Sequence, residues 1–169
     1  MKILAVISAC IVLISHPALV KESAPISSMS IEQRAEEAHM DVDEFILISS
    51  ITEAESDRST SGSLQGRIYI SLVILNRAYA DDRFPDTITG VITQRNQFST
   101  CRRNADGTYY SVTDRTDRSD EAVIEAVRFF ETGEAPMVLF FNCRYFFSGR
   151  EPFPNPEGGD TIGGNYFSL

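Results

Sequence analysis

The sequence contains only two histidines, His16 and His39, among its 169 residues. No group of histidine, cysteine and carboxylate residues has the spacing of a zinc site. We therefore expect neither a metal-dependent hydrolase nor a requirement for any metal ion or other cofactor. A serine triad and a cysteine peptidase each need a histidine base. Pairing of Cys101 or Cys143 with His39 is the arrangement left open for a cysteine peptidase.

Positive charge is also scarce, since the net charge is −9 and no lysine follows Lys21. Proteins that bind nucleic acid need clustered lysine or arginine to neutralise phosphates. We therefore expect no nucleic-acid partner. The composition, with 43% hydrophobic and 23% charged residues, is that of one globular domain with a real core.

Long hydrophobic runs are absent except at the N-terminus, where Lys2 precedes an apolar stretch from Ile3 to Ser15. This stretch has the length of a signal-peptide core and is too short to span a bilayer comfortably. We expect residues 1–24 to be a signal peptide with its cleavage region, which would export the protein to the periplasm or the exterior. Contact with a membrane is expected only through this segment. Two alternatives stay open: Ile7 to Cys10 looks like a lipoprotein cleavage box, and an uncleaved segment would act as an anchor.

Two apolar helices are predicted close together in the chain. The first begins at Asp41 or Asp43 and ends near Glu55. The second, Arg67 to Ala78, is apolar on every side, which is typical of a central buried helix. Helical spacing assigns four positions of the first helix to the core: Phe45, Ile48, Ile51 and Thr52.

The remaining elements are predicted to be shorter. Residues 25–40 should form a linker and a short polar helix that opens with a capping box at Ser30. Two further helices are expected, one from Asp86 to Ile92 and one from Asp120 to Thr132, the latter capped by Ser119 and ended by Gly133. Buried strands are expected at Met137 to Asn142 and at Thr161 to Ser168. Long loops are expected at Gln94 to Tyr110 and at Arg144 to Gly159.

Two carboxylates, Glu53 and Glu55, end the first apolar helix. A carboxylate placed where a buried helix meets a loop can lose part of its water and still face a cleft. Such burial raises a glutamate pKa from about 4.3 towards about 6, which suits a general acid. Two positions correspond to about 200° around a helix, so only one of the two can face a given cleft. The alternative is that both are solvated residues at a fraying helix end.

With histidine scarce and carboxylates abundant, the chemistry that remains is cleavage of a glycosidic bond. Aromatic and amide side chains in the predicted loops and strands suit the faces and N-acetyl groups of sugars. The candidate substrate-binding residues are Gln97, Phe98, Ser99, Asn142, Asn165 and Tyr166. Any one of them could instead be a core aromatic or a turn residue.

Several short motifs follow one another between Ile48 and Leu169. They are Glu53-Ala54, a Gly66 to Arg77 helix ending in Asn76-Arg77, Arg83 to Ile88 with Gly90-Val91-Ile92, Gln97-Phe98-Ser99, Leu139 to Asn142, and Ile162 to Phe167. This ordered set resembles the cell-wall hydrolase family typified by spore-cortex-lytic enzymes. The resemblance implies a lysozyme-like domain over residues 41–169, of α+β class, mainly helical with a small antiparallel sheet.

The resemblance also implies an activity. It implies cleavage of the MurNAc–GlcNAc bond in the glycan strands of peptidoglycan, as a lytic transglycosylase with Glu53 as the catalytic residue. The family usually continues Ala-Arg-Gly-Glu after this glutamate, whereas this chain continues Ala54-Glu55-Ser56-Asp57. Glu55-Ser56 resembles the Glu-Ser pair of other transglycosylases, so Glu55 stays a candidate.

Two other functions stay open on the same fold. If water attacks the sugar, the enzyme is a muramidase and needs a second carboxylate, for which Glu55 and Asp57 are the nearest candidates. The other is a wall-binding or structural protein without catalytic activity, which the acidic charge fits equally well.

We predict a disulfide between Cys101 and Cys143, because removal of the signal peptide would leave these two cysteines in an oxidising compartment. The bond would stabilise the exported protein by about 3–4 kcal/mol. Thiol titration of the denatured, unreduced protein should find no free thiol, and N-terminal sequencing of the same sample should place the mature start between residues 19 and 25. Two free thiols in the exported protein would contradict the disulfide.

Overall fold

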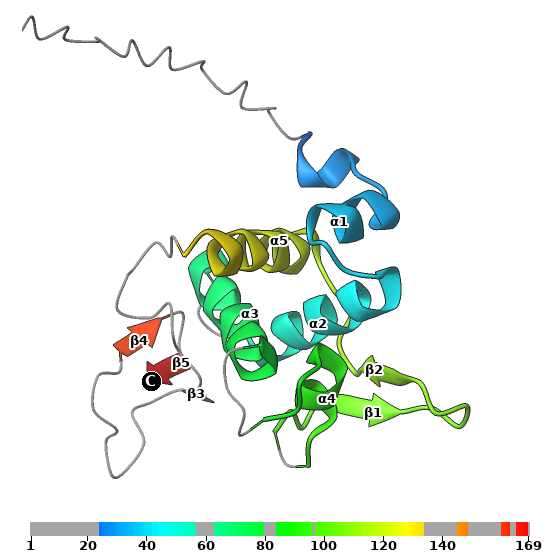
Figure 1. Ribbon diagram of the computed structural model, residues 1–169, viewed down its shortest axis with the longest axis vertical. Helices are drawn as coiled ribbons and strands as arrows, with labels where there is room; N and C mark the ends of the chain where they lie inside the picture. The colour runs from blue at the N-terminus through cyan, green and yellow to red at the C-terminus, as the bar shows by residue number, and fades with distance from the viewer. Residues whose placement is uncertain are drawn as a thin grey trace, which may run out of the picture.

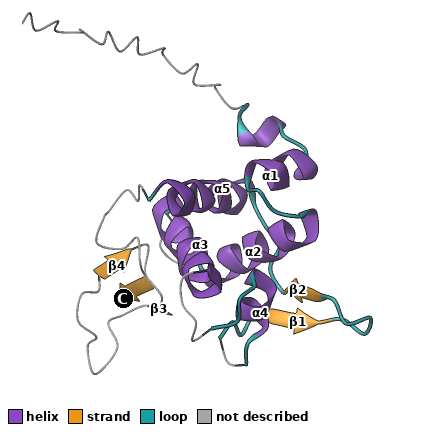
Figure 2. Ribbon diagram, in the orientation of Figure 1, coloured by secondary structure: helices purple, strands orange, loops and turns teal. Residues whose placement is uncertain are grey.

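The computed structural model describes residues 24–56, 63–79, 84–95, 97–133, 145–148, 160–162 and 165–168. Helix α3 (Leu64–Tyr79) lies at the centre of the fold and contacts α2 (Val42–Glu55), α4 (Ile88–Thr93) and α5 (Asp117–Thr132) (Figure 1). Helices make up most of the described structure (Figure 2). The predicted α+β, mainly helical class is therefore confirmed.

The sequence predicts α3 well, because its residues are apolar on every side. All of its residues from Gly66 to Ala78 are buried. At its start the Oγ of Ser63 accepts a hydrogen bond from the backbone N–H of Gly66 at 3.0 Å. Since every face of α3 is covered, the other helices are arranged around it.

Helix α2 begins at the predicted cap Asp41, whose Oδ1 accepts a hydrogen bond from the backbone N–H of Glu44 at 2.9 Å. The helix continues unbroken through Glu53 and Glu55. The four predicted core positions, Phe45, Ile48, Ile51 and Thr52, are each fully buried. Both carboxylates therefore belong to an ordered helix end that is anchored by its buried face.

The predicted start of α5 is wrong by one turn. The helix begins after Thr116, and Ser119 is the third residue of its first turn. The two side chains form a capping box, in which the Oγ1 of Thr116 accepts from the N–H of Ser119 and the Oγ of Ser119 accepts from the N–H of Thr116. Gly133 ends the helix in the left-handed conformation, as predicted, with φ of 70°. The predicted capping box of α1 (Ile31–Glu37) at Ser30 is also present.

A buried carboxylate joins three helices. Asp120, on α5, is fully buried and accepts hydrogen bonds from Arg34 of α1 at 2.5 Å, from Ser49 of α2 at 2.5 Å, and from Arg115. Loss of one partner of such a buried ion pair costs about 3–5 kcal/mol. The network therefore fixes α1 and the segment before α5 against α2.

The segment predicted as a long loop, Gln94 to Tyr110, contains a β-hairpin. Strand β1 (Cys101–Arg103) pairs antiparallel with β2 (Tyr109–Ser111), with Cys101 opposite Ser111. Between them, Gly107 has φ of 95°, a conformation that glycine adopts without strain. The prediction was wrong because three-residue strands are too short to show an alternating pattern, although the Asp-Gly pair in the turn is a hairpin signal.

A second sheet contains β3 (Tyr145–Ser148), β5 (Asn165–Ser168) and β4 (Asp160–Ile162), in that order and all antiparallel. The predicted single strand Thr161 to Ser168 is thus two strands, and the predicted loop Arg144 to Gly159 includes β3. The signal for two strands is the Gly-Gly pair at 163–164, since two glycines between strands favour a tight hairpin. The predicted strand Met137 to Asn142 lies outside the described residues.

The two sheets lie on opposite sides of α3 in the view of Figure 1. The two-stranded sheet borders α2 through β2, and the other sheet contacts α3 through β3. Among the helices in the described part of the chain, none combines the length and apolar character needed to cross a membrane.

Candidate active site

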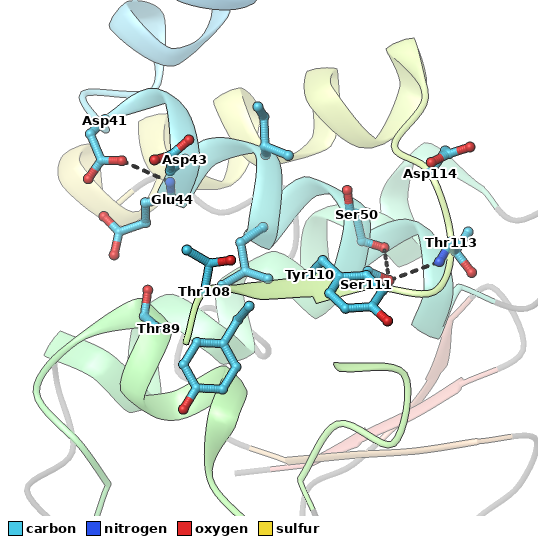
Figure 3. Close-up of a pocket in the computed structure, with 13 residues that line it drawn as sticks. Asp41, Asp43, Glu44, Ser50, Thr89, Thr108, Tyr110, Ser111, Thr113 and Asp114 are labelled. Carbon is cyan, nitrogen blue, oxygen red and sulfur yellow. Dashed lines mark hydrogen bonds between the residues drawn. The ribbon is translucent and has the colours of Figure 1, made fainter. Parts of the chain in front are cut away.

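A groove of about 650 Å³ runs beside α2, and we call it the α2 groove (Figure 3). Helix α2 contributes Glu44, Ile46 and Ser50 to its lining, α4 contributes Thr89, and β2 contributes Tyr110. Most of its polar lining groups are hydroxyls and carboxylates, and among the described residues no lysine or arginine lines it. The groove therefore presents aromatic, hydroxyl and acidic surfaces side by side.

Glu53 lines neither the α2 groove nor the hollow beside it, but it contacts a residue of that hollow. A second hollow, of about 470 Å³, shares Ile46, Ser50 and Asp114 with the first and reaches Thr116. The Oγ1 of Thr116 donates a hydrogen bond to Oε2 of Glu53 at 2.8 Å. Glu53 also follows Ser50 by about one turn of α2, so its carboxylate lies next to the second hollow through its contact with Thr116.

Glu53 is also held by a buried arginine. The Nε of Arg67 donates to Oε2 of Glu53 at 2.9 Å, and its Nη2 donates to Oε1 at 2.8 Å. The side chain of Glu53 is 12% exposed and that of Arg67 is 9% exposed. Such a two-point contact with a guanidinium is among the stronger ion pairs and favours the ionised carboxylate. The contact with Arg67 therefore acts on Glu53 in the direction opposite to burial. Burial was the reason for expecting a protonated Glu53 from the sequence.

Glu55 has different surroundings. Its Oε1 accepts a hydrogen bond from the Oγ1 of Thr100 at 2.9 Å. Burial raises the pKa of Glu55, and the hydrogen bond from Thr100 offsets part of that rise. The two carboxylates at the end of α2 are therefore held by two different segments of the chain.

The β1–β2 hairpin and its flanks are attached to α2 at three points. Thr100 binds Glu55, the Oγ of Ser111 donates to the backbone carbonyl of Ser50 at 3.3 Å, and Thr116 binds Glu53. The backbone N–H of Val112 closes the hairpin by donating to the carbonyl of Thr100. One supersecondary unit thus borders the groove and positions both carboxylates.

Three of the predicted substrate-binding residues lie outside the α2 groove, and their role in binding stays a prediction. Gln97 accepts a hydrogen bond from Arg77 at 3.1 Å, and Phe98 is buried in the core, 5% exposed, beneath the same guanidinium. The backbone carbonyl of Ser99 accepts from Arg102. None of the three lines the α2 groove. Asn142 and the side chains of Asn165 and Tyr166 lie outside what the structure describes.

The sequence reasoning missed four residues of this site: Ser50, Arg67, Tyr110 and Thr116. Arg67 carried a signal, because an arginine within a run that is otherwise buried is rare unless it is paired. Thr116 carried one as well, since it stands three residues before Ser119 in the spacing of a helix cap.

The cysteine-based alternatives gain no support from the described residues. Cys101 is a half-buried free thiol whose pKa is raised by burial, with Arg102 acting in the opposite direction. His39 instead binds Glu131 on the surface, with 2.7 Å between Nδ1 and Oε1. Cys143 lies outside the described residues, so the disulfide stays a prediction. Within the described ranges no three histidine, cysteine or carboxylate side chains are grouped so as to bind a metal ion.

Residues 61–167 match the sequence profile of a family described as cell wall hydrolase. The chain belongs to the cell wall hydrolase family. Cleavage of cell wall peptidoglycan is therefore its general activity. The matched region begins after Glu53 and Glu55, so the profile does not choose between them.

A solved structure supports the same fold. The catalytic domain of the Bacillus cereus SleB protein is similar with a TM-score of 0.55 and 24% sequence identity, over 76% of this chain and 91% of that one. No curated protein matches the sequence. The predicted resemblance to spore-cortex-lytic cell wall hydrolases is thus confirmed at the level of family and fold.

Glu55 should make the stability of this cell wall hydrolase fall as pH rises. Because burial raises its pKa, the folded protein holds this proton more tightly than the unfolded chain, and stability is lost between the unfolded and folded pKa values. Glu55→Gln retains an acceptor for Thr100 but cannot ionise. Relative to the wild type, its free energy of unfolding should therefore increase between about pH 4 and pH 7 in urea titrations.

A matched control for this measurement is Glu36→Gln, at an exposed position of α1. Its free energy of unfolding should follow that of the wild type across the same pH range. Equal pH dependence in the wild type and Glu55→Gln would contradict the prediction.

Proposed function

We propose that the protein is a lytic transglycosylase that cleaves the MurNAc–GlcNAc bond of peptidoglycan with a single catalytic carboxyl group, that of Glu53. In the first step, Glu53 donates its proton to the glycosidic oxygen, and the C1–O bond breaks with its electron pair going to that oxygen. The resulting carboxylate then takes the proton of the muramyl C6 hydroxyl. The C6 oxygen attacks C1, and a 1,6-anhydro product forms without water.

One observation carries this proposal: a nearly buried carboxyl group ends the helix that lines the α2 groove. Glu53 is 12% exposed and fixed by Arg67 and Thr116, so its oxygens have a defined direction. Fixed geometry is the first requirement for a general acid–base group, and a suitable pKa is the second. Membership of the cell wall hydrolase family supports the substrate.

The shape and lining of the α2 groove support an extended glycan as the ligand. Tyr109 and Tyr110 line it from β2 and keep 37% and 45% of their surface exposed, although large aromatic side chains are usually more buried. An amphipathic tyrosine can offer its ring to a sugar face and its hydroxyl to a sugar hydroxyl. The labelled Thr89 and Thr108 add further hydroxyls along the groove (Figure 3).

A muramidase that uses water is the second candidate reaction. It needs another carboxylate near the bond that breaks. Glu55 faces Thr100, whereas Glu53 faces Thr116, and Asp57 lies outside the described residues. The single-carboxyl reaction requires only Glu53, so it is the one that we propose.

We also propose that residues 1–24 export the protein. Peptidoglycan lies outside the cytoplasmic membrane, so its cleavage requires the enzyme to reach that compartment. The signal-like composition of this segment supports the same conclusion.

Glu53→Gln should fold normally and still bind purified peptidoglycan, but lose at least about 10²-fold in cleavage rate, because the amide cannot cycle a proton. Mass spectrometry of wild-type digests should find 1,6-anhydro-muramyl products. The control Glu55→Gln should lose far less activity. A dead Glu55→Gln with an active Glu53→Gln would exchange the two roles, and reducing-end sugars alone would indicate a muramidase. A wild type that binds but never cleaves would indicate a wall-binding protein.

Replacement of both groove tyrosines, Tyr109→Ala with Tyr110→Ala, should raise KM for peptidoglycan about 10-fold or more while kcat changes little. Each ring contributes apolar contact area to the bound glycan and is remote from the proton transfer. Val112→Ala is the control, since Val112 is 57% exposed next to the same strand but does not line the groove. An unchanged KM in the double variant would exclude the groove as the glycan site.

A further inference from the structure

The Arg67–Glu53 ion pair has a consequence for the reaction itself. A general acid must carry a proton when the substrate binds, yet Arg67 is placed to hold Glu53 without one. Its guanidinium comes from α3, the most buried helix of the fold, and is 9% exposed. Arginine is rarely buried to this extent unless it is paired.

We infer that Arg67 is a positioning residue that aims the Glu53 carboxylate and keeps it ionised in the free enzyme. The inference rests on the proposed catalytic role of Glu53. Two parallel N–H···O contacts, at 2.9 and 2.8 Å, fix the plane of the carboxylate. Thr116 then contacts Oε2 at 2.8 Å from the side of the groove.

The other charged groups around Glu53 in the described structure do not replace Arg67. On α2, Glu55 is held by Thr100. Beside Thr116, the guanidinium of Arg115 is held by Asp120, and Asp117 is held by Arg34. Asp114, which lines both hollows, would disfavour a second negative charge nearby. Arg67 is thus the cation in direct contact with Glu53 among these groups.

The ion pair acts in opposite directions on the two halves of the reaction. It disfavours the protonated Glu53 that must first donate its proton to the glycosidic oxygen. It favours the carboxylate that results, and it keeps that carboxylate aimed at the C6 hydroxyl. The enzyme should therefore work best at acidic pH, with activity lost as pH rises through the titration of Glu53. Loss of Arg67 would remove the guanidinium that favours the Glu53 carboxylate while the burial of Glu53 remains, so this titration should move to higher pH.

The test compares the pH dependence of kcat/KM, which reports groups of the free enzyme, for the wild type, Arg67→Gln and Arg67→Lys. The pH at which kcat/KM falls on the basic side of the profile, which we call the basic limb, should rise by about 1 pH unit or more in Arg67→Gln. In Arg67→Lys it should stay close to that of the wild type, because the charge is retained. The lysine variant should nevertheless lose about 10-fold in kcat, since an ammonium cannot reproduce the two-point contact.

A second readout does not depend on catalysis. Carbon-13 NMR of the Glu53 carboxyl, assigned with Glu53→Gln, should show its titration moving to higher pH in Arg67→Gln by the same amount as the activity limb. If Arg67→Gln is too unstable to measure, Arg67→Lys still tests the aiming role, because its kcat should fall while both titrations stay close to those of the wild type. Arg128→Gln removes an exposed ion pair with Glu125 and should leave both readouts unchanged.

The outcomes separate the two proposals. An unchanged limb and an unchanged Glu53 titration in Arg67→Gln would overturn the role of Arg67, even if Glu53→Gln is inactive. Full activity in Glu53→Gln would overturn the catalytic role of Glu53, whatever the NMR titration shows. A lower stability of Arg67→Gln with both pH readouts unmoved would identify a purely structural ion pair.

Discussion

The complete burial of α3 is the constraint on which the rest of the structure depends. A helix that is apolar on every side must be covered on every side, and α2, α4 and α5 provide much of that cover. Covering α3 places the C-terminal end of α2 next to the N-terminal end of α3. Glu53 and Arg67 lie at those two ends, so their contact is a direct result of how the two helices pack.

The parts of the fold that the sequence predicts are those with repeated hydrophobic spacing. Phe45, Ile48 and Ile51 follow the helical period and are all buried, and the continuous apolar run gives α3 almost residue by residue. The β1–β2 hairpin was missed because three residues a strand cannot display a period. Thr116 and Ser119 were confused because a capping box uses both, and either one alone looks like the cap.

The candidate site was less predictable than the fold, and the reason is electrostatic. Sequence spacing placed Glu53 and Glu55 at the end of a buried helix, but burial acts on both of them. What separates them is the partner that each meets: an arginine from α3 for Glu53, and a neutral hydroxyl before β1 for Glu55. These partners are 14 and 45 residues away in sequence, so no local pattern reports them. The tyrosines of the groove were missed because the hairpin that carries them was not predicted.

Arginine forms the buried ion pairs of this fold, in a chain that has no lysine after Lys21. Arg34 and Arg67 are each 9% exposed and bind carboxylates, and Arg115 shares Asp120 with Arg34. A guanidinium is less strongly hydrated than an ammonium and offers several donors in a fixed plane, so it loses less on burial and binds more than one oxygen. Asp120 uses two such arginines to fix the segment that carries Thr116, and Thr116 binds the carboxylate that Arg67 holds from the other side. The direction of the Glu53 carboxyl group is therefore set by a chain of arginine contacts that begins at Arg34 of α1, beside the second hollow, and ends on the central helix.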